Sequence, residues 1–234
     1  MTPLTPAVHT RENLSILAGL ETSVLHWIAR RLPASIDSDH LSAIALASMA
    51  AAGLSFSAYR YSRIAAAGVV VSLFANWFGD SLDGTLARVR EQQRPRYGFY
   101  VDHVIDIAGS AMLFAGIACS GLISPLVALA VLVMYLLVSA ESYLATHAAG
   151  VFRMSFLGFG PTELRIVLGI GAVRAATSPS ATFGSAASFR LFDVGGGVAC
   201  VGLMIAFGVS AFRNTRALYV AEPLPARRTE SRAA

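Results

Sequence analysis

The residues best suited to chemistry are four aspartates that lie inside two apolar stretches. Asp80 and Asp83 stand three residues apart, and Asp102 and Asp106 stand four apart, so each pair shares one face of a helix. A carboxylate within a membrane-spanning helix costs about 2.5–3.5 kcal/mol on insertion scales and marks a functional site by default. A polar, basic turn, Val89–Tyr97, separates the pairs. Folding the two stretches into an antiparallel hairpin about this turn would bring the four side chains together.

Such a cluster predicts a metal site, because neighbouring carboxylates repel one another unless cations hold them. An all-oxygen site suits hard divalent ions such as Mg²⁺ or Mn²⁺, and substrate phosphates commonly complete the coordination. Two ions that bridge a diphosphate would stabilise both the attacking and the leaving oxygen. We therefore expect two divalent ions, held close enough to the end of the hairpin for a soluble nucleotide to reach them.

The composition predicts that these helices lie in a membrane. Of the 234 residues, 55% are hydrophobic and 14% are charged, whereas soluble domains carry about a quarter charged residues. The mean hydropathy is +0.61. All 18 basic residues are Arg, and most flank apolar stretches, as they do in the cytoplasmic loops of membrane proteins. The net charge of +4 therefore does not predict a nucleic-acid partner.

Six apolar stretches approach the roughly 20 residues that cross a hydrocarbon core about 30 Å thick. The predicted fold is thus all-α, an integral membrane six-helix bundle with spans at Leu41–Ser57, Ile64–Leu86, Phe99–Leu122, Pro125–Thr146, Pro161–Ala176 and Val194–Phe212. Six spans place both termini on one side, and most Arg residues fall on that side. The positive-inside bias predicts that the termini and the Arg88–Arg96 loop are cytoplasmic, in a multi-pass protein of a bacterial inner membrane.

The remaining segments define the predicted domain organisation. Within residues 1–35, apolar positions in Leu14–Leu32 recur at helical spacing, which predicts an amphipathic helix on the membrane surface. The alternative is a soluble helix packed on the spans. Residues 36–212 form the six-span domain, with a loop at 177–189, and residues 213–234 form a polar, Arg-rich cytoplasmic tail.

Two segments of the hairpin resemble the signature of the CDP-alcohol phosphotransferase family. They read Asp80-Ser-Leu-Asp83-Gly84-Thr-Leu-Ala87-Arg88 and, nine residues later, Gly98-Phe-Tyr-Val-Asp102-His-Val-Ile-Asp106. Every fixed position of that pattern is filled, with spacing inside its range. The family's six spans and N-terminal surface helix also match, so the resemblance covers most of the chain.

The resemblance implies roles for the aspartates. Asp80, Asp83 and Asp102 would bind the divalent metals. Asp106 would complete this carboxylate set and act as the general base that takes the proton from the acceptor alcohol. A positioned base of this kind typically contributes about 10²–10⁴-fold to a rate.

The neighbouring positions would bind the nucleotide. The resemblance implies that Gly84 and Ala87 line the CDP pocket, with Arg88 near the nucleotide or in a salt bridge to a motif aspartate. Gly98 precedes Asp102 by one turn and leaves space for a ligand or a close helix contact. Asn76, one turn before Asp80, either lines this pocket or hydrogen-bonds a neighbouring helix.

A second patch would contact the acceptor. Glu163 and Arg165 open the fifth predicted span and His147 ends the fourth. This patch is loosely similar to the choline/ethanolamine phosphotransferase branch of the family. Glu163 also fits an ordinary helix start just after Pro161. Orienting or packing roles suit His147 and His103 better than metal ligation.

The predicted function is a membrane transferase of phospholipid synthesis. It would move a substituted phosphate from a CDP-linked donor, CDP-diacylglycerol or a CDP-amino-alcohol, to an alcohol acceptor and release CMP. The resemblance also implies a symmetric homodimer. One alternative is a membrane prenyltransferase, whose two Asp motifs usually lie on well-separated helices. The other is an ion or proton transporter, which needs acids or helix breaks spread over several midplane helices.

Overall fold

The structure is a computed structural model that describes residues 10–12, 18–149, 151–153, 161–178, 180–183 and 187–224. These residues are mostly helical, as the sequence predicts. The helices are α1 (Ala18–Ala29), α2 (Ser38–Ala58), α3 (Ala65–Val89), α4 (Pro95–Cys119), α5 (Pro125–Ala149), α6 (Pro161–Thr177) and α7 (Leu191–Ala221). The strands are short: β1 (Thr10–Glu12), β2 (Val151–Arg153), β3 (Ser180–Phe183) and β4 (Ala187–Arg190).

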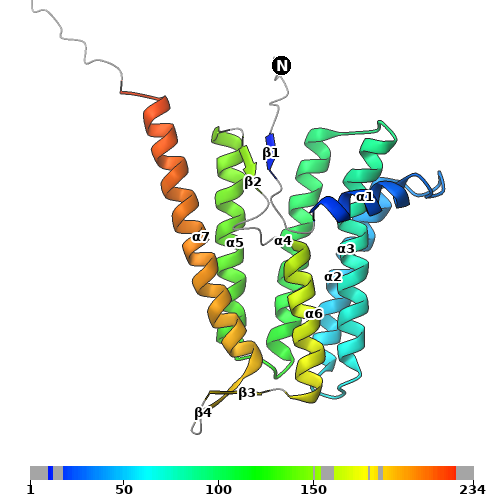
Figure 1. Ribbon diagram of the computed structural model, residues 1–234, viewed down its shortest axis with the longest axis vertical. Helices are drawn as coiled ribbons and strands as arrows, with labels where there is room; N and C mark the ends of the chain where they lie inside the picture. Colours follow the sequence, from blue (N-terminus) through cyan, green and yellow to red (C-terminus); the bar gives the residue numbers. More distant parts are fainter. Residues whose placement is uncertain are drawn as a thin grey trace, which may run out of the picture.

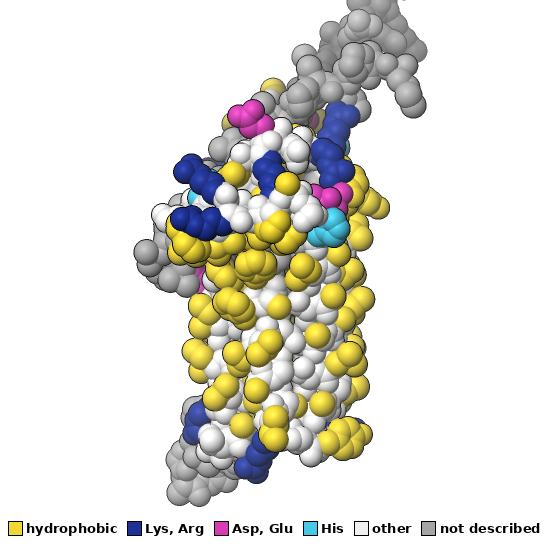
Figure 2. Space-filling model, turned by 90° about the vertical axis from the view of Figure 1, so that its right-hand side faces the viewer, with side chains coloured by type: hydrophobic (Ala, Val, Ile, Leu, Met, Phe, Trp, Pro, Cys, Tyr) yellow, Lys and Arg dark blue, Asp and Glu magenta, His cyan; other side chains and the backbone are white. Residues whose placement is uncertain are grey.

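Helices α2 to α7 run along the long axis of the molecule, and α1 lies across one end of them (Figure 1). Five of these helices, α2, α3, α4, α5 and α7, are long and apolar enough to cross a membrane. Figure 2 shows a flank covered mainly by apolar side chains, with Arg side chains gathered toward the two ends. Five of the six predicted spans therefore correspond to candidate spanning helices.

Helix α6 coincides with the sixth predicted span, Pro161–Ala176, but is shorter than the others. It has 17 residues, which give a length of about 25 Å at 1.5 Å per residue. A typical hydrocarbon core is about 30 Å thick. Helix α6 packs against α3 within the bundle. Its passage through the membrane, and with it the six-span topology, stays a prediction.

The segment after α6 is more regular than a loop. Within residues 177–189, β3 pairs in antiparallel fashion with β4, so that Ser180 lies opposite Arg190. This hairpin leads directly into α7. Strand β1 pairs in parallel with β2, which follows α5.

Helix α7 continues past the end of its apolar stretch. The predicted span stops at Phe212, whereas the helix extends to Ala221. No Gly or Pro interrupts Arg213–Ala221, and Pro223 follows just after the helix ends. The first part of the predicted polar tail is therefore a helical extension, and residues 225–234 lie outside the described residues.

Helix α2 lies against both α3 and α4 through glycines. A Cβ added to Gly116 of α4 would overlap the carbonyl oxygen of Gly53 in α2, so the two backbones touch there. On α3, a Cβ added to Gly79 would lie 2.6 Å from the carbonyl oxygen of Leu41 in α2. Because Gly79 directly precedes Asp80, this close approach fixes the backbone of α3 next to the first aspartate of the motif.

Helix α1 packs one face on this end of the bundle. Leu25 and Ala29 are buried in a cluster with Leu82 of α3, while Trp27 and Val24 on the other face are 58% and 48% exposed. The predicted amphipathic helix at the membrane surface stays a prediction. The first apolar positions of the predicted helix lie outside the described residues.

The turn between α3 and α4 is tied to the segment between α1 and α2. The Arg90 guanidinium donates hydrogen bonds to three backbone carbonyls of that segment, those of Leu32, Pro33 and Ile36. Arg94 pairs with Asp39 in the first turn of α2 at 2.5 Å. The turn that separates the two aspartate pairs is therefore held in one position.

Candidate active site

The four predicted aspartates lie on α3 and α4, toward the end of the bundle that α1 covers. Each is half-buried, and Asp106 lies within electrostatic reach of Asp80, Asp83 and Asp102. That the four carboxylates form one metal-binding cluster stays a prediction. Helices α3 and α4, however, pack mainly on α2 rather than on each other. The two pairs therefore approach through their side chains and not through contact of the two backbones.

Helix α2 holds Asp83 in place. The Ser42 hydroxyl donates a hydrogen bond to Asp83 Oδ2 at 2.6 Å, and the Ser38 hydroxyl donates to the Asp83 carbonyl oxygen at 2.9 Å. The other carboxylate oxygen accepts from the Gly84 amide. Neither serine is among the residues predicted from the sequence. Their signal is a polar pair spaced by four residues at the start of an apolar helix.

Asp80 is paired with Arg165 of α6. The distance from Arg165 Nη2 to Asp80 Oδ2 is 2.5 Å, and the two side chains are only 14% and 22% exposed. Arg165 Nε donates to Asn76 Oδ1 at 2.7 Å, and Asn76 Nδ2 donates to the Ala45 carbonyl oxygen at 3.0 Å. Of the two roles considered for Asn76, a hydrogen bond to a neighbouring helix is the one found.

Aromatic residues surround the second pair. The His103 ring is buried, lies edge-on to Tyr143 of α5 with centroids 4.3 Å apart, and stacks on Phe99. This agrees with the predicted packing role for His103. Tyr143 and Tyr135 also lie within electrostatic reach of Asp106. Tyr135 is not among the residues predicted from the sequence, although it stands eight residues before Tyr143, a spacing that keeps both on one broad face of α5.

The expected nucleotide-pocket residues lie around the end of α3 and the start of α4. Arg88 donates a hydrogen bond to the Thr85 hydroxyl at 2.9 Å. A Cβ on Gly84 would lie 3.3 Å from Arg88 Nη1, and one on Gly98 would meet nothing within 4 Å. Ala87 is half-buried. Gly98 therefore leaves open space beside the aspartates, and the CDP pocket itself stays a prediction.

The expected acceptor residues are not all gathered at the site. Arg165 contacts Asp80 directly, as described above. Glu163 lies in the first turn of α6. His147 is exposed in the last turn of α5, and no contact places it beside the aspartates.

Glu21 of α1 is a further carboxylate that the sequence analysis missed. It accepts hydrogen bonds from Trp77 Nε1 at 2.7 Å, the Ser81 hydroxyl at 2.9 Å and the Thr162 hydroxyl at 3.2 Å. Ser81 lies between the two aspartates of α3, and Thr162 is the second residue of α6. Glu21 therefore joins α1 to both helices that carry the Asp80–Arg165 pair.

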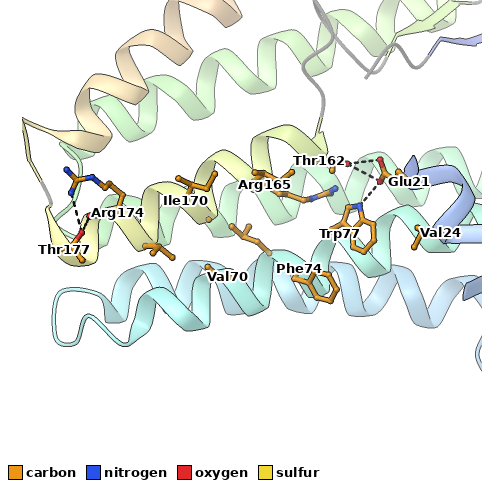
Figure 3. Close-up of a pocket in the computed structure, with 14 residues that line it drawn as sticks. Glu21, Val24, Val70, Phe74, Trp77, Thr162, Arg165, Ile170, Arg174 and Thr177 are labelled. Carbon is orange, nitrogen blue, oxygen red and sulfur yellow. Dashed lines mark hydrogen bonds between the residues drawn. The ribbon is translucent and has the colours of Figure 1, made fainter. Parts of the chain in front are cut away.

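A largely apolar cavity of about 850 Å³ lies between α3 and α6, with α1 across one end (Figure 3). Glu21, Thr162 and Arg165 lie toward this end, and Arg174 and Thr177 lie toward the other. Between them the wall is apolar and includes Val70, Leu73, Phe74, Ile166, Ile170 and Val173. Because Arg165 also contacts Asp80, the cavity reaches the edge of the carboxylate cluster.

The donor set fits a hard divalent cation, since it consists of four carboxylates from two neighbouring helices. Among the described residues, no three His, Cys, Asp or Glu side chains converge on one point as a metal cage. Arg165 provides the counter-charge for Asp80, and Ser42 binds Asp83. A cation at this cluster would therefore compete with the partners that these two carboxylates have here.

The sequence profile of the CDP-alcohol phosphatidyltransferase family matches residues 39–214, which is well over half of the chain. The matched range runs from the first turn of α2 into the C-terminal part of α7 and includes all four aspartates. No curated protein matches the chain.

Proposed function

Because the chain belongs to the CDP-alcohol phosphatidyltransferase family, we propose that it moves a substituted phosphate from a CDP-linked donor to an alcohol, with release of CMP. The donor is CDP-diacylglycerol or a CDP-amino-alcohol, and the product is a phospholipid or its precursor. The observation that carries the proposal is the family match over a segment that holds all four aspartates, with Asp106 within electrostatic reach of Asp80, Asp83 and Asp102.

The reaction is a substitution at phosphorus. The acceptor oxygen bonds to the phosphorus that carries the lipid or amino-alcohol group, and the bond from that phosphorus to the bridging oxygen of the diphosphate breaks. CMP leaves with the bridging oxygen. Asp106 takes the proton of the acceptor hydroxyl, so the attacking oxygen gains electron density as the new bond forms.

Asp80, Asp83 and Asp102, with Asp106 beside them, would hold Mg²⁺ or Mn²⁺. Bound there, such ions supply positive charge that stabilises the diphosphate and the leaving group. The chain's own part is to fix the carboxylates: Ser42 of α2 holds Asp83, and the close approach of Gly79 to the same helix fixes the backbone next to Asp80. Gly84, Ala87 and Gly98 would line the nucleotide pocket beside Arg88.

The cavity between α3 and α6 supports a lipid-linked reactant. Its wall is apolar and its polar end reaches the carboxylates, so the chain of an amphiphile would lie in it with the head group at the reacting centre. A CDP-amino-alcohol donor would reverse the assignment, with the lipid alcohol as acceptor. Residues Glu163 and His147 stay acceptor-side candidates.

One assay tests the proposal. The purified protein in lipid vesicles receives CDP-diacylglycerol or CDP-choline, each with matched alcohol acceptors, and CMP release is measured with Mg²⁺ and with excess EDTA. We expect CMP from one donor class, and loss of release in EDTA because the carboxylates then lack a counter-charge. Absence of CMP with both donors would overturn the proposal, and full release in EDTA would overturn the metal requirement. The family match lends no support to a prenyltransferase or a transporter.

The proposed orientation places the termini and the turn between α3 and α4 in the cytoplasm, where CDP conjugates are available. The basis is the Arg distribution along the sequence. In a variant without Cys119 and Cys200, a cysteine in the turn at residues 91–93 should resist a membrane-impermeant thiol reagent in intact cells. A cysteine in the β3–β4 segment should react. The reverse pattern would contradict the orientation.

The proposed homodimer would be tested by the mass of the detergent-solubilised protein.

A further inference from the structure

Arg165 is a largely buried cation between two parts of the site. Its side chain is 14% exposed, contacts Asp80 on one side and borders the apolar cavity on the other. Figure 3 shows it reaching from α6 toward α3. A buried cation needs a counter-charge, since loss of its hydration costs several kcal/mol. In this arrangement Asp80 supplies that charge.

The same carboxylate has a second role in the proposed function, as a ligand of a divalent cation. When a divalent ion binds Asp80, it repels the guanidinium and competes for the carboxylate oxygen that Arg165 now contacts. Arg165 then requires another anion. A guanidinium presents five donors in a planar fork that suits phosphate oxygens, and it has no acceptor with which to bind a second cation.

The surroundings of Arg165 would keep it at the site during such a change. Arg165 Nε donates to Asn76 Oδ1, and Asn76 is itself held by the Ala45 carbonyl oxygen of α2. These bonds fix the inner nitrogen of the guanidinium. The terminal nitrogen that contacts Asp80 can therefore change its acceptor while the side chain stays between the carboxylates and the cavity.

We propose that Arg165 exchanges Asp80 for a phosphate group of the substrate when a divalent cation binds Asp80, so that loading the carboxylates creates the anion-binding site. The exchange rests on the proposed function for the presence of the cation. It adds the substrate class: a reactant whose phosphate lies on the α6 side of the cluster. That phosphate belongs either to a lipid head group or to a soluble acceptor.

The first test uses inorganic phosphate as the probe, in excess EDTA, so that no metal can bind phosphate directly. Asp80→Asn removes the charge that holds Arg165. Since a hydrogen bond to a charged group is worth about 1.5–3 kcal/mol, phosphate affinity by calorimetry should rise about tenfold or more over the unchanged protein. Asp83→Asn is the matched control, because it removes an equal charge from the same helix and leaves the Arg165 pair intact.

The double variant Asp80→Asn, Arg165→Gln completes the cycle. It should lose the gain in phosphate affinity, because the gain requires the released guanidinium. An equal gain in Asp83→Asn would overturn the exchange and leave only general relief of negative charge. A gain that survives in the double variant, or no gain in Asp80→Asn, would also overturn it.

A measurement on the unchanged protein covers the case in which Asp80→Asn does not fold. Phenylglyoxal modification of each Arg, located by mass spectrometry, reports on guanidinium release. Mg²⁺ should increase modification of Arg165 severalfold, and added phosphate should then protect it. Arg90, whose guanidinium is bound to backbone carbonyls, is the internal control. If Mg²⁺ does not change the extent of Arg165 modification, the exchange is overturned.

The source of the phosphate is distinguished by chain length. Gly169 lines the cavity, and Gly169→Leu would place a side chain in it. If the phosphate belongs to a lipid, Gly169→Leu should weaken the binding of dodecyl phosphate and leave the binding of inorganic phosphate unchanged. If the binding of both compounds is unchanged, the phosphate belongs to a soluble acceptor. If the protein releases CMP but Asp80→Asn shows no gain in phosphate affinity, only the exchange is overturned. If Asp80→Asn shows that gain but neither donor yields CMP, only the proposed function is overturned.

Discussion

The two sides of the helical bundle are packed very differently. In α2, α3 and α4, 33%, 33% and 39% of the residues in the most apolar stretch are buried, against 11% in α5 and 6% in α7. Gly53, Gly79 and Gly116 bring the backbones of α2, α3 and α4 into close approach, whereas a Cβ on Gly202 or Gly208 of α7 would meet nothing within 4 Å. We call these regions the tight side and the open side.

The aspartates belong to the tight side. A site that must hold several carboxylates in fixed relative positions needs supports whose own positions are locked by packing. From helix α5, Tyr135 and Tyr143 lie within electrostatic reach of Asp106. Helices α5 and α7 pack mainly on each other, and their apolar outer faces are what a lipid environment requires. The positions of the carboxylates are therefore set by α2, α3, α4 and α6.

The largest expected effect comes from comparing Asp106, the proposed base on the tight side, with Glu141, a carboxylate on the open side. Asp106→Asn keeps size and loses basicity, so CMP release should fall at least about 10²-fold, the usual contribution of a positioned base. Calorimetric binding of the CDP conjugate should persist. Glu141→Gln on α5, whose carboxylate accepts from Asn214 of α7, is the control and should change the rate by no more than a few-fold. A comparable loss of CMP release in both variants would mean that the tight side and the open side do not differ in this respect.

The second prediction concerns stability. Gly116→Ala would force the α2 and α4 backbones apart, and overpacking of this kind costs about 1–3 kcal/mol. Gly202→Ala on α7 enters open space and should leave the melting temperature unchanged or slightly raised, since Ala favours a helix over Gly by up to about 1 kcal/mol. Thermal unfolding of both variants in one detergent checks this. Equal melting temperatures for the two would mean that the glycine contact does not hold the tight side together.

The smallest effect tests how α2 positions a carboxylate. Ser42→Ala removes the hydroxyl that binds Asp83 Oδ2, and a hydrogen bond to a charged group is worth about 1.5–3 kcal/mol at most. The Mg²⁺ concentration for half-maximal CMP release should shift severalfold, with near-normal turnover at saturating Mg²⁺. Ser210→Ala on α7 loses a longer bond, 3.3 Å from Asn214, and should leave the Mg²⁺ dependence unchanged. A lower turnover that Mg²⁺ does not rescue in Ser42→Ala would argue against positioning.

The sequence predicts the aspartate pairs well because their spacing is a local property. Helical periodicity places Asp80 with Asp83 and Asp102 with Asp106 on shared faces, and the short basic turn predicts that the two pairs lie within electrostatic reach of each other, as Asp106 does of the other three. The family match over residues 39–214 agrees with the resemblance carried by this motif. The apolar lengths likewise predict five of the candidate spans.

The supporting contacts could not be predicted in the same way because they join distant segments. Ser42 reaches Asp83, Glu21 reaches Thr162, and Arg165 reaches Asp80, through an arrangement of helices that no local pattern specifies. The end of α7 lies beyond the predicted span for a different reason. Hydrophobicity indicates which residues lie in a membrane. A helix, by contrast, continues until a residue disfavours the helical backbone conformation, here just before Pro223.

The pairing of Asp80 with a residue 85 positions later has a consequence for biogenesis. As the chain leaves the ribosome, α2 and α3 emerge together, so Asp83 finds Ser42 within its own helical hairpin. Asp80 has no such neighbour, because Arg165 follows only after α4 and α5 have been synthesised. Until α6 is synthesised, the nascent protein carries one carboxylate of the candidate site without its counter-ion, and insertion of the early helices must tolerate that charge.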